Sequence, residues 1–342
     1  MAEEAIGVVL IGAGPHARVW CEAYRPLAGV HLVGVYDDDP DAATRLARQF
    51  PELAVFRSLG DVLGNSEVWI AEIDTPVLEA LDVAEKCLES GISVGIRGTA
   101  LHDATAVDAM VEAKQAKVAL RVYSPAHYSP IVTAARELLN ATRIGDVQTL
   151  RVRSVAGRHG RADEPIVTEP LPAAPIACGP EFEALPLAAL LGPVRAVHAW
   201  TTEAATLVTW HNAGEAGARR FGVYEAVRAP GIVVRGPLEP VAESFEFAGT
   251  DGYIFGGALT GRDGDGPALA TYIGDRYEVP IARFDEDPTT AYRAAAADLV
   301  RAARYRSKPE FADLEAIRIA RFREAIRESI RTGQEALLTD SD

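Results

Sequence analysis

The sequence predicts an α/β protein, with a doubly wound parallel sheet at the amino end followed by an α+β part with a large, mostly antiparallel sheet. Three observations predict this fold class. Short apolar runs alternate with stretches of helical periodicity as far as about residue 122. A glycine-rich turn directly follows the first apolar run. Beyond residue 125, successive apolar runs are separated by Gly, Asn and Pro instead of by helices.

The amino-terminal part contains the elements expected of the parallel sheet. Strands are expected at the apolar runs 6–11, 30–36, 53–56, 68–74, 92–96 and 118–122. Helices are expected where apolar side chains recur at helical spacing, at 16–25, 40–49, 76–90 and 104–116. Such an alternation implies right-handed crossovers and hence parallel strands. A doubly wound sheet binds its ligand beyond the carboxyl ends of the strands, where the strand order reverses.

The carboxy-terminal part has a different pattern. The expected elements are a helix at 129–140, a strand at 147–155, a Pro- and Ala-rich loop at 162–180 and a short helix at 181–191. Antiparallel strands are then expected at 194–202, 205–212, 219–228, 231–235, 243–249 and 252–259, before two helices at 289–306 and 313–332. Because 342 residues exceed one typical core, we expect two domains, 1–124 and 125–342.

The composition argues against several classes of protein. A formal net charge of −15 disfavours a nucleic-acid binder and a protein held on an anionic membrane, because both need basic surface. No apolar run approaches the roughly 20 residues that cross a bilayer, and no secretory signal is recognisable. The three cysteines, Cys21, Cys87 and Cys178, lack metal-ligand spacing, so no metal site is expected. These features predict a cytoplasmic protein.

The turn after the first strand has the form Gly-x-Gly-x-x-Ala and runs from Gly12 through Gly14 to Ala17. Between a strand and a helix, this form binds a dinucleotide. The first glycine permits the tight turn, the second lets the backbone approach a pyrophosphate, and the small third residue lets helix and strand pack closely. The helix start offers N–H groups to the phosphates, and Pro15 costs little there. His16 is expected to contact the cofactor or line the cleft entrance.

Asp37 ends the second strand, about 20 residues beyond the glycines, where a carboxylate grips a ribose hydroxyl. A carboxylate at this place repels a 2′-phosphate, which favours NAD over NADP. The alternative is that the acidic run 37–41 is a solvated turn that only caps the following helix. We favour cofactor binding, because the glycine turn and Asp37 occur together at the expected spacing.

Several further motifs occur in order along the chain. They are Ile73-Asp74-Thr75-Pro76, Leu88-Glu89-Ser90-Gly91, Tyr128-Ser129-Pro130, Leu191-Gly192-Pro193-Val194, Phe247–Gly252 and Glu328–Gln334. With the glycine turn and Asp37, this set resembles the glucose–fructose oxidoreductase / inositol dehydrogenase / MocA (Gfo/Idh/MocA) family over nearly the whole chain. The resemblance implies a Rossmann domain, a substrate domain, and nicotinamide-dependent chemistry on a sugar-like or other small polar substrate. It also implies a homodimer or homotetramer, and a nicotinamide near Thr75, Pro76 and Arg97.

The residues that usually carry the chemistry of this family are replaced. Members usually carry Glu-Lys-Pro after the fifth strand, where this chain has Arg97-Gly98-Thr99, so Gly98 stands at the lysine position. An Asp and a His of the family correspond to Cys178 and Phe182. Neither glycine nor phenylalanine can take the proton that leaves a hydroxyl during hydride transfer. Two classes of function stay open: an oxidoreductase with another proton-transferring group, or a catalytically degenerate relative that binds dinucleotide as a sensing or scaffolding subunit.

His127 and Asp74 are the candidate replacements. His127 begins a helix at the domain junction, and an imidazole, with an ordinary pKa near 6.5, acts as acid or base; the alternative is a structural histidine. Asp74 lies at the carboxyl end of the fourth strand, where it could bind a ribose hydroxyl, pair with Arg97, or accept the proton. Glu72 falls in the same strand, and a carboxylate buried there needs a charged or hydrogen-bonding partner.

Overall fold

The chain folds into two compact units. The computed structural model describes residues 5–338, except 76, 116, 160–186, 189, 214–218, 237, 239–240, 258–260, 263 and 285–286. The first unit contains residues 1–123 and 288–320, and the second contains 124–287 and 321–342. The expected division was 1–124 and 125–342. The segment 288–320 differs from it, because its helix packs on the parallel sheet of the first unit.

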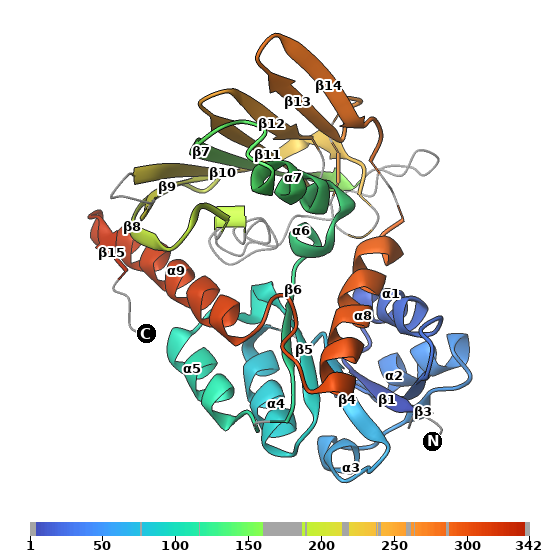
Figure 1. Ribbon diagram of the computed structural model, residues 1–342. Helices are drawn as coiled ribbons and strands as arrows, with labels where there is room; N and C mark the ends of the chain where they lie inside the picture. The colour runs from blue at the N-terminus through green and yellow to red at the C-terminus, as the bar shows by residue number, and fades with distance from the viewer. Residues whose placement is uncertain are drawn as a thin grey trace. The chain divides into compact units, whose positions relative to one another are not determined.

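The first unit is built on a six-stranded parallel sheet in the order β3-β2-β1-β4-β5-β6 (Figure 1). Its strands are β1 (Ile6–Ile11), β2 (Val30–Tyr36), β3 (Ala54–Val55), β4 (Val68–Ile73), β5 (Ser93–Arg97) and β6 (Leu120–Tyr123). The strand order reverses between β1 and β4, which creates the switch point at which doubly wound sheets bind ligands. This topology confirms the predicted Rossmann fold.

Helices flank this sheet. They are α1 (Pro15–Tyr24), α2 (Pro40–Gln49), α3 (Leu59–Leu63), α4 (Val77–Glu89), α5 (Ala104–Ala113) and α8 (Thr289–Tyr305), with a 3₁₀ turn at Gly98–Ala100. α1 and α8 lie side by side, and α4 contacts α5 (Figure 1). The buried face of α8 is rich in alanine, including Ala295, Ala296 and Ala302. These small side chains let α8 approach α1 and the strands β4, β5 and β6 closely.

A buried ion pair crosses three strands of the parallel sheet. Glu72 on β4, Gly95 on β5 and Arg121 on β6 are neighbours in register. Arg121 Nη2 lies 2.5 Å from Glu72 Oε1, and Tyr24 of α1 donates its hydroxyl to Glu72 Oε2 at 2.7 Å. Residue 95 leaves room for the pair, because a Cβ there would lie 2.2 Å from Arg121 Nη2. Burial raises the pKa of the Glu72 carboxyl, and Arg121 and Tyr24 oppose that rise.

Removing one partner of this pair is expected to destabilise the first unit. Arg121→Met leaves the Glu72 carboxyl buried without its cation, which costs about 3–5 kcal/mol of unfolding free energy, whereas Glu72→Met/Arg121→Met recovers most of the loss. Arg331→Met is the control, because it breaks an exposed ion pair with Glu328, and exposed pairs contribute little to stability. Urea unfolding followed by circular dichroism measures all three variants. Equal stability of Arg121→Met and the unmodified protein would contradict this account.

The second unit is built on a nine-stranded sheet in the order β14-β13-β12-β11-β7-β10-β9-β8-β15 (Figure 1). Its strands are β7 (Val147–His159), β8 (Val194–Thr201), β9 (Ala205–Ala213), β10 (Arg219–Val234), β11 (Val241–Gly249), β12 (Gly252–Gly256), β13 (Leu269–Ile273), β14 (Arg276–Ile281) and β15 (Ala336–Leu337). Among the described strand pairs of this sheet, β7 and β10 are parallel and the others antiparallel. The large, mostly antiparallel sheet is therefore confirmed.

The prediction of individual strands was less complete here. β10 is one continuous strand where two runs were expected, and β13, β14 and β15 were not predicted. β14 is exposed along nearly its whole length; Tyr277, Val279 and Ile281 alternate along it, but Pro280 within the run argues against a strand.

One face of this second sheet carries the hydrophobic core of its unit. The helices of the unit are α6 (Pro125–Tyr128), α7 (Pro130–Asn140) and the part of α9 (Asp313–Thr332) beyond residue 320. Phe322 of α9 packs edge-on against Trp210 of β9, with ring centroids 5.5 Å apart. Along β7, Val152 points into this core, whereas Arg151 and Arg153 are exposed on the opposite face.

Candidate functional site

The turn between β1 and α1 is fixed to both neighbouring strands. Gly12 N donates to Tyr36 O of β2 at 2.8 Å, and Asp74 N, just beyond β4, donates to Ile11 O at 2.8 Å. Gly12 has a φ of +102°, and a Cβ at this position would lie 2.3 Å from Asp74 O. Only glycine fits here. The turn therefore lies directly at the switch point between β1 and β4.

The amino end of α1 has no side-chain cap. Gly14 is the N-cap residue and Pro15 begins the helix. A Cβ at Gly14 would meet nothing nearer than Asp74 Oδ2, at 3.7 Å, so packing within the described chain does not require glycine there. The missing side chain instead leaves space for an anion at the positive end of the helix. Pro15 has no N–H and Ala17 N donates to Gly14 O at 3.1 Å, so the helix dipole and the remaining amides of the turn are what would attract a diphosphate.

The Asp37 carboxylate closes the turn on the β2 side. Its Oδ2 accepts a hydrogen bond from Ala13 N at 2.7 Å, and its Oδ1 accepts one from Asp39 N at 2.8 Å. The helix α2 is capped by Asp39, which accepts from Asp41 N at 3.0 Å and whose pKa this bond lowers. Helix capping is thus done by Asp39, a member of the acidic run, as the solvated-turn alternative expected, whereas Asp37 also bonds to the glycine turn. Each Asp37 oxygen can accept a further hydrogen bond from a ribose hydroxyl.

Asp74 and Arg97 face each other at the carboxyl ends of β4 and β5. Asp74 Oδ1 lies 3.8 Å from Arg97 Nη1, and the side chains are 11% and 12% exposed. The structure thus shows the ion pair that was one of three expected roles of Asp74. The Oγ1 atom of Thr75 is buried and has no hydrogen-bond partner among the described residues. A bound ligand would satisfy this hydroxyl, which is costly to leave unpaired. Pro76 lies outside the described residues.

His16 contacts a tyrosine from a distant part of the sequence. Its Nδ1 lies 2.5 Å from Tyr292 Oη on α8, and the two rings are stacked with their centroids 6.1 Å apart. The ring of Tyr292 also packs against Trp20 and Tyr123. Tyr292 was not predicted from the sequence, because no local motif marks it and His16 is 276 positions away.

Gly98 opens the 3₁₀ turn after β5, at the position where the resemblance places a lysine. A Cβ at Gly98 would meet nothing nearer than Tyr123 O at 3.5 Å, which is an ordinary contact. Packing therefore does not impose glycine at this position. Cys178 and Phe182, the other two replaced positions, lie outside the described residues.

His127 lies in α6 of the second unit and is 4% exposed. Burial, together with the nearby Arg136 guanidinium, lowers the pKa of its imidazole to about 3. The ring is therefore neutral near pH 7 and holds an additional proton only weakly.

The lowered pKa of His127 predicts a pH-dependent stability. An imidazole in an unfolded chain has a pKa near 6.5 and this one has a folded pKa of about 3, so the unfolded state binds the proton first as the pH falls. The contribution of His127 is complete above about pH 6.5 and is lost progressively towards pH 3. In His127→Gln, the unfolding free energy should fall less steeply across this window, by up to about 1.4 kcal/mol per pH unit. Urea titrations at several pH values measure the slope, and identical slopes in both proteins would refute the prediction.

Within the described residues, no group of three or more His, Cys, Asp or Glu side chains is placed to hold a metal ion. No helix among them combines the length and the hydrophobicity that crossing a membrane requires. Cys21 and Cys87 are buried, and burial raises the pKa of each thiol to about 12, so neither is an activated nucleophile.

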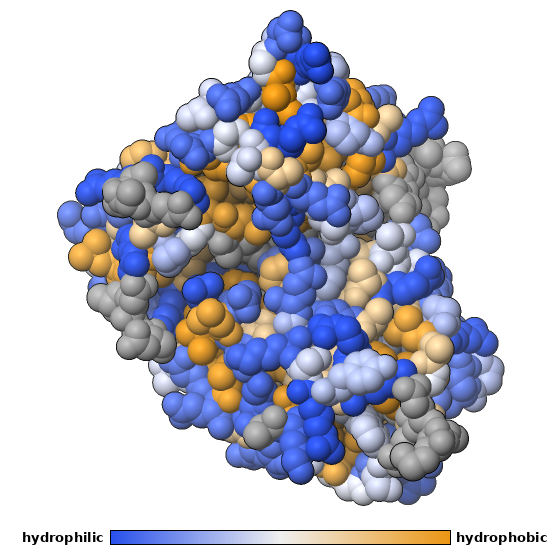
Figure 2. All heavy atoms as spheres, viewed as in Figure 1, coloured by the Kyte–Doolittle hydropathy of each residue, from blue (hydrophilic) through white to orange (hydrophobic). Residues whose placement is uncertain are grey.

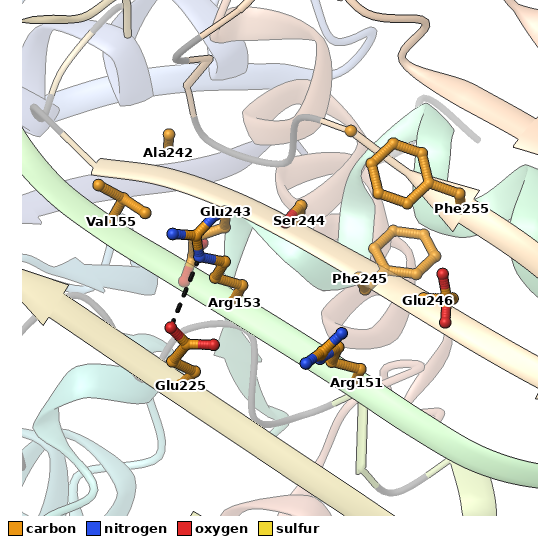
Figure 3. Close-up of a pocket in the computed structure, with 11 residues that line it drawn as sticks. Arg151, Arg153, Val155, Glu225, Ala242, Glu243, Ser244, Phe245, Glu246 and Phe255 are labelled. Atoms are coloured by element: carbon orange, nitrogen blue, oxygen red, sulfur yellow. Dashed lines mark ion pairs between the residues drawn. The ribbon is translucent and has the colours of Figure 1, made fainter. Parts of the chain in front are cut away.

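A hollow of about 440 Å³ opens on the outward face of the second sheet (Figure 3). Arg151 and Arg153 of β7 line it beside Glu225 of β10 and Glu246 of β11. Arg153 Nε lies 3.8 Å from Glu225 Oε1. Exposed aromatic side chains occur towards both edges of the same face: Trp200, Phe221, Tyr253, Tyr272 and Tyr277. Hydrophobic side chains also interrupt the hydrophilic surface over β13 and β14 (Figure 2).

No protein-family model and no curated relative matches the sequence. Solved structures match over nearly the whole chain. A myo-inositol dehydrogenase from Corynebacterium glutamicum has a TM-score of 0.74 at 17% identity, covering 98% of this chain and 100% of that one. A levoglucosan dehydrogenase in complex with NADH and levoglucosan has a TM-score of 0.78 at 16% identity, covering 98% and 100%. An oxidoreductase from Agrobacterium radiobacter in complex with NAD⁺, L-tartaric acid and magnesium has a TM-score of 0.79 at 15% identity, covering 97% and 98%.

These similarities show the fold of the chain. Its structural neighbours are inositol dehydrogenase and related oxidoreductases of the Gfo/Idh/MocA type, and they share both parts of the architecture. Because the identities are 15–17%, the likeness is one of fold, and the chemistry has to be judged from the residues of the site.

Proposed function

We propose that this chain is an NAD(P)-dependent oxidoreductase of the Gfo/Idh/MocA type that acts on a sugar-like or other small polar substrate. The observation that carries the proposal is the turn Gly12–Ala17, in which the glycines and an uncapped helix start leave space for a diphosphate at the positive end of the helix. The fold supports it, because structural neighbours were crystallised with NADH or NAD⁺.

The proposed cofactor site uses residues at the carboxyl edge of the parallel sheet. The pyrophosphate is assigned to the turn, where Gly12, Gly14, Pro15 and His16 lie. Asp37 is assigned to the adenosine ribose, and its charge favours NAD over NADP. The nicotinamide is assigned to the ends of β4 and β5, where Thr75 and Arg97 lie, and to Pro76, which is outside the described residues. When bound, the nicotinamide supplies the hydride acceptor or donor, while the chain orients it and handles the proton.

Asp74 is proposed to accept the substrate proton, and His127 is proposed to contact the substrate. The Asp74 carboxylate lies beside the glycine turn, and its ion pair with Arg97 holds it at the strand ends. His127, which is neutral near pH 7, is assigned a hydrogen bond to the substrate hydroxyl.

A second candidate function is a catalytically degenerate relative that binds dinucleotide as a sensing or scaffolding subunit. Gly98, at the lysine position, favours this alternative. Nicotinamide absorbance, followed while polyols and sugars are offered to the purified protein, separates the two. Turnover supports the oxidoreductase, and dinucleotide binding without turnover across a broad panel supports the alternative.

Calorimetric titration with NADH and NADPH tests the cofactor site. The unmodified protein should bind NADH more tightly than NADPH. Asp37→Asn should weaken NADH binding by about tenfold or more, because it removes a charge-assisted hydrogen bond worth about 1.5–3 kcal/mol. Asp39→Asn is the matched control, since it changes a carboxylate two residues away that caps α2, and it should bind NADH as the unmodified protein does.

The outcomes distinguish a wrong assignment of Asp37 from a wrong proposed function. Unchanged NADH binding by Asp37→Asn would remove Asp37 from the site. Failure of the unmodified protein to bind either dinucleotide would refute both candidate functions.

The outward face of the second sheet is proposed to join copies of the chain into a homodimer or homotetramer. Arg151 and Arg153 lie beside Glu225 and Glu246 near its centre, so two copies related by a twofold axis can place opposite charges against each other. The aromatic side chains towards both edges add apolar area, which an interface would cover.

A charge placed in the exposed aromatic group should dissociate such an assembly. In Phe221→Glu, the buried carboxylate would lack a partner, so light scattering should report a smaller mass than for the unmodified protein at equal concentration. Tyr305→Glu, which alters an exposed aromatic residue of the first unit, is the control and should keep the original mass. A monomeric unmodified protein, or an unchanged mass for Phe221→Glu, would count against this interface.

A further inference from the structure

Three turns of the second unit are bonded to one another beside the strands β11 to β14 (Figure 1). They connect α7 to β7, β11 to β12, and β13 to β14. Asp251 N donates to Ile144 O, and Gly274 N donates to Asp251 O, both at 3.0 Å. Thr250 N donates to Asp146 O, and Asp146 N donates to Thr250 Oγ1, both at 3.1 Å. These bonds restrain the three turns, although surface turns are usually mobile.

Glycines allow the backbones of these turns to approach closely. A Cβ at Gly249 would lie 2.2 Å from Ile144 O. Gly145 has a φ of +70°, and a Cβ there would lie 2.1 Å from Thr250 Oγ1. The motif Phe247–Gly252, of which the proposed dinucleotide site uses no residue, therefore shapes this group of turns.

A pocket of about 670 Å³ opens beside these turns. Its lining includes Arg143, which follows α7, and Arg276 and Glu278 of β14. In the register of β13 and β14, Arg276 is opposite Ile273 and Glu278 is opposite Thr271. Ile273 packs against the hydrophobic core, so the two charged residues of β14 share the core-facing side of the sheet. The volume is within the range of small-molecule pockets, roughly 300–1,000 Å³.

The charged groups of this pocket are not matched to one another within the chain. Five charged side chains line it: Arg143, Asp251, Asp275, Arg276 and Glu278. Within the part of the chain that the structure describes, none of these five side chains forms an ion pair or a hydrogen bond. Their donors and acceptors are therefore available to a ligand that enters the pocket.

The mixture of groups in the pocket determines the class of ligand. The guanidiniums offer only donors, and the carboxylates offer only acceptors. An anion would face three carboxylates, and a cation would face two guanidiniums. A neutral hydroxyl both donates and accepts, so neighbouring hydroxyls on one ring can bond to a guanidinium and to a carboxylate together. Ile273 adds an apolar surface for the C–H groups of such a ring.

We propose that this pocket binds an uncharged polyhydroxy compound, of the size of a monosaccharide or a cyclitol. Arg143 and Arg276 donate to oxygens of the ligand, and the carboxylates of Asp251, Asp275 and Glu278 accept from its hydroxyls. Because the surrounding turns are already bonded to one another, little ordering of the backbone accompanies binding. The site lies wholly in the second unit and uses no residue assigned to the dinucleotide, so it does not rest on the proposed function.

Calorimetric titration of the full chain with myo-inositol tests this pocket. The control ligand is cyclohexanol, which keeps a six-membered ring with a single hydroxyl and should not bind. Arg143→Met and Arg276→Met should each weaken the binding of myo-inositol by about tenfold or more, because each removes charge-assisted hydrogen bonds. Arg48→Met changes an exposed arginine of α2 in the first unit and should bind as the unmodified protein does. Circular dichroism should show that all three variants are folded, because the replaced side chains are exposed.

Hydrogen–deuterium exchange of the same samples locates the ligand. With myo-inositol bound, exchange should slow in peptides that cover residues 141–146 and 272–278, and this slowing should be lost in Arg276→Met. Absence of binding, or binding that both arginine variants keep at full strength, would overturn the proposal. Phosphate or calcium ions that slow exchange in these peptides at lower concentrations than myo-inositol would overturn the ligand class. A protein that binds myo-inositol here but neither dinucleotide would refute the proposed function and leave this site in place.

Discussion

Three hydrogen bonds hold the turn between β1 and α1, and the geometry of the dinucleotide unit depends on them. Gly12 N bonds to the end of β2, Asp74 N bonds to the end of β1, and the Asp37 carboxylate bonds to Ala13 N. Together these bonds hold the carboxyl ends of β2, β1 and β4 close to Gly12 and Ala13. Because Gly12 lies against the backbone of Asp74, no side chain can occupy that point. The proposed anion site therefore consists of backbone groups, which reorganise little when a ligand binds.

A row of buried polar and aromatic side chains runs from this turn along one face of α1. His16, Trp20 and Tyr24 are spaced by four residues and so lie on the same face of the helix. Tyr24 bonds to the Glu72–Arg121 pair, Trp20 lies under the Arg121 guanidinium, and His16 reaches Tyr292. A buried ion pair contributes little net stability, but removal of one partner is costly. We infer that the pair fixes the register of β4, β5 and β6 against α1.

Much of the fold could be predicted from the sequence, because its signals are local. The period of the apolar residues and the glycine turn were enough to predict the parallel sheet, and the turn residues predicted a mostly antiparallel second sheet. The contribution of 288–320 to the first unit could not be predicted, since it depends on how an alanine-rich helix packs on a sheet far away in sequence. β14 was missed although Tyr277, Val279 and Ile281 alternate along it, because Pro280 interrupts the run and proline argues against a strand. At the site, Asp37 and Asp39 belong to one acidic run, and only the hydrogen bonds separate their tasks. The role of Tyr292 could not be predicted, because its partner His16 is 276 positions away in the sequence and no local motif links the two residues.

The claim that supports all the others is that the amides of this turn bind a diphosphate. Hydrogen–deuterium exchange of the full chain, with and without millimolar NADH, measures that most directly. The account predicts slower exchange in peptides that cover Gly12–Ala17, and unchanged exchange in peptides from the exposed strand β14. Equal exchange at the turn with and without NADH would contradict the account.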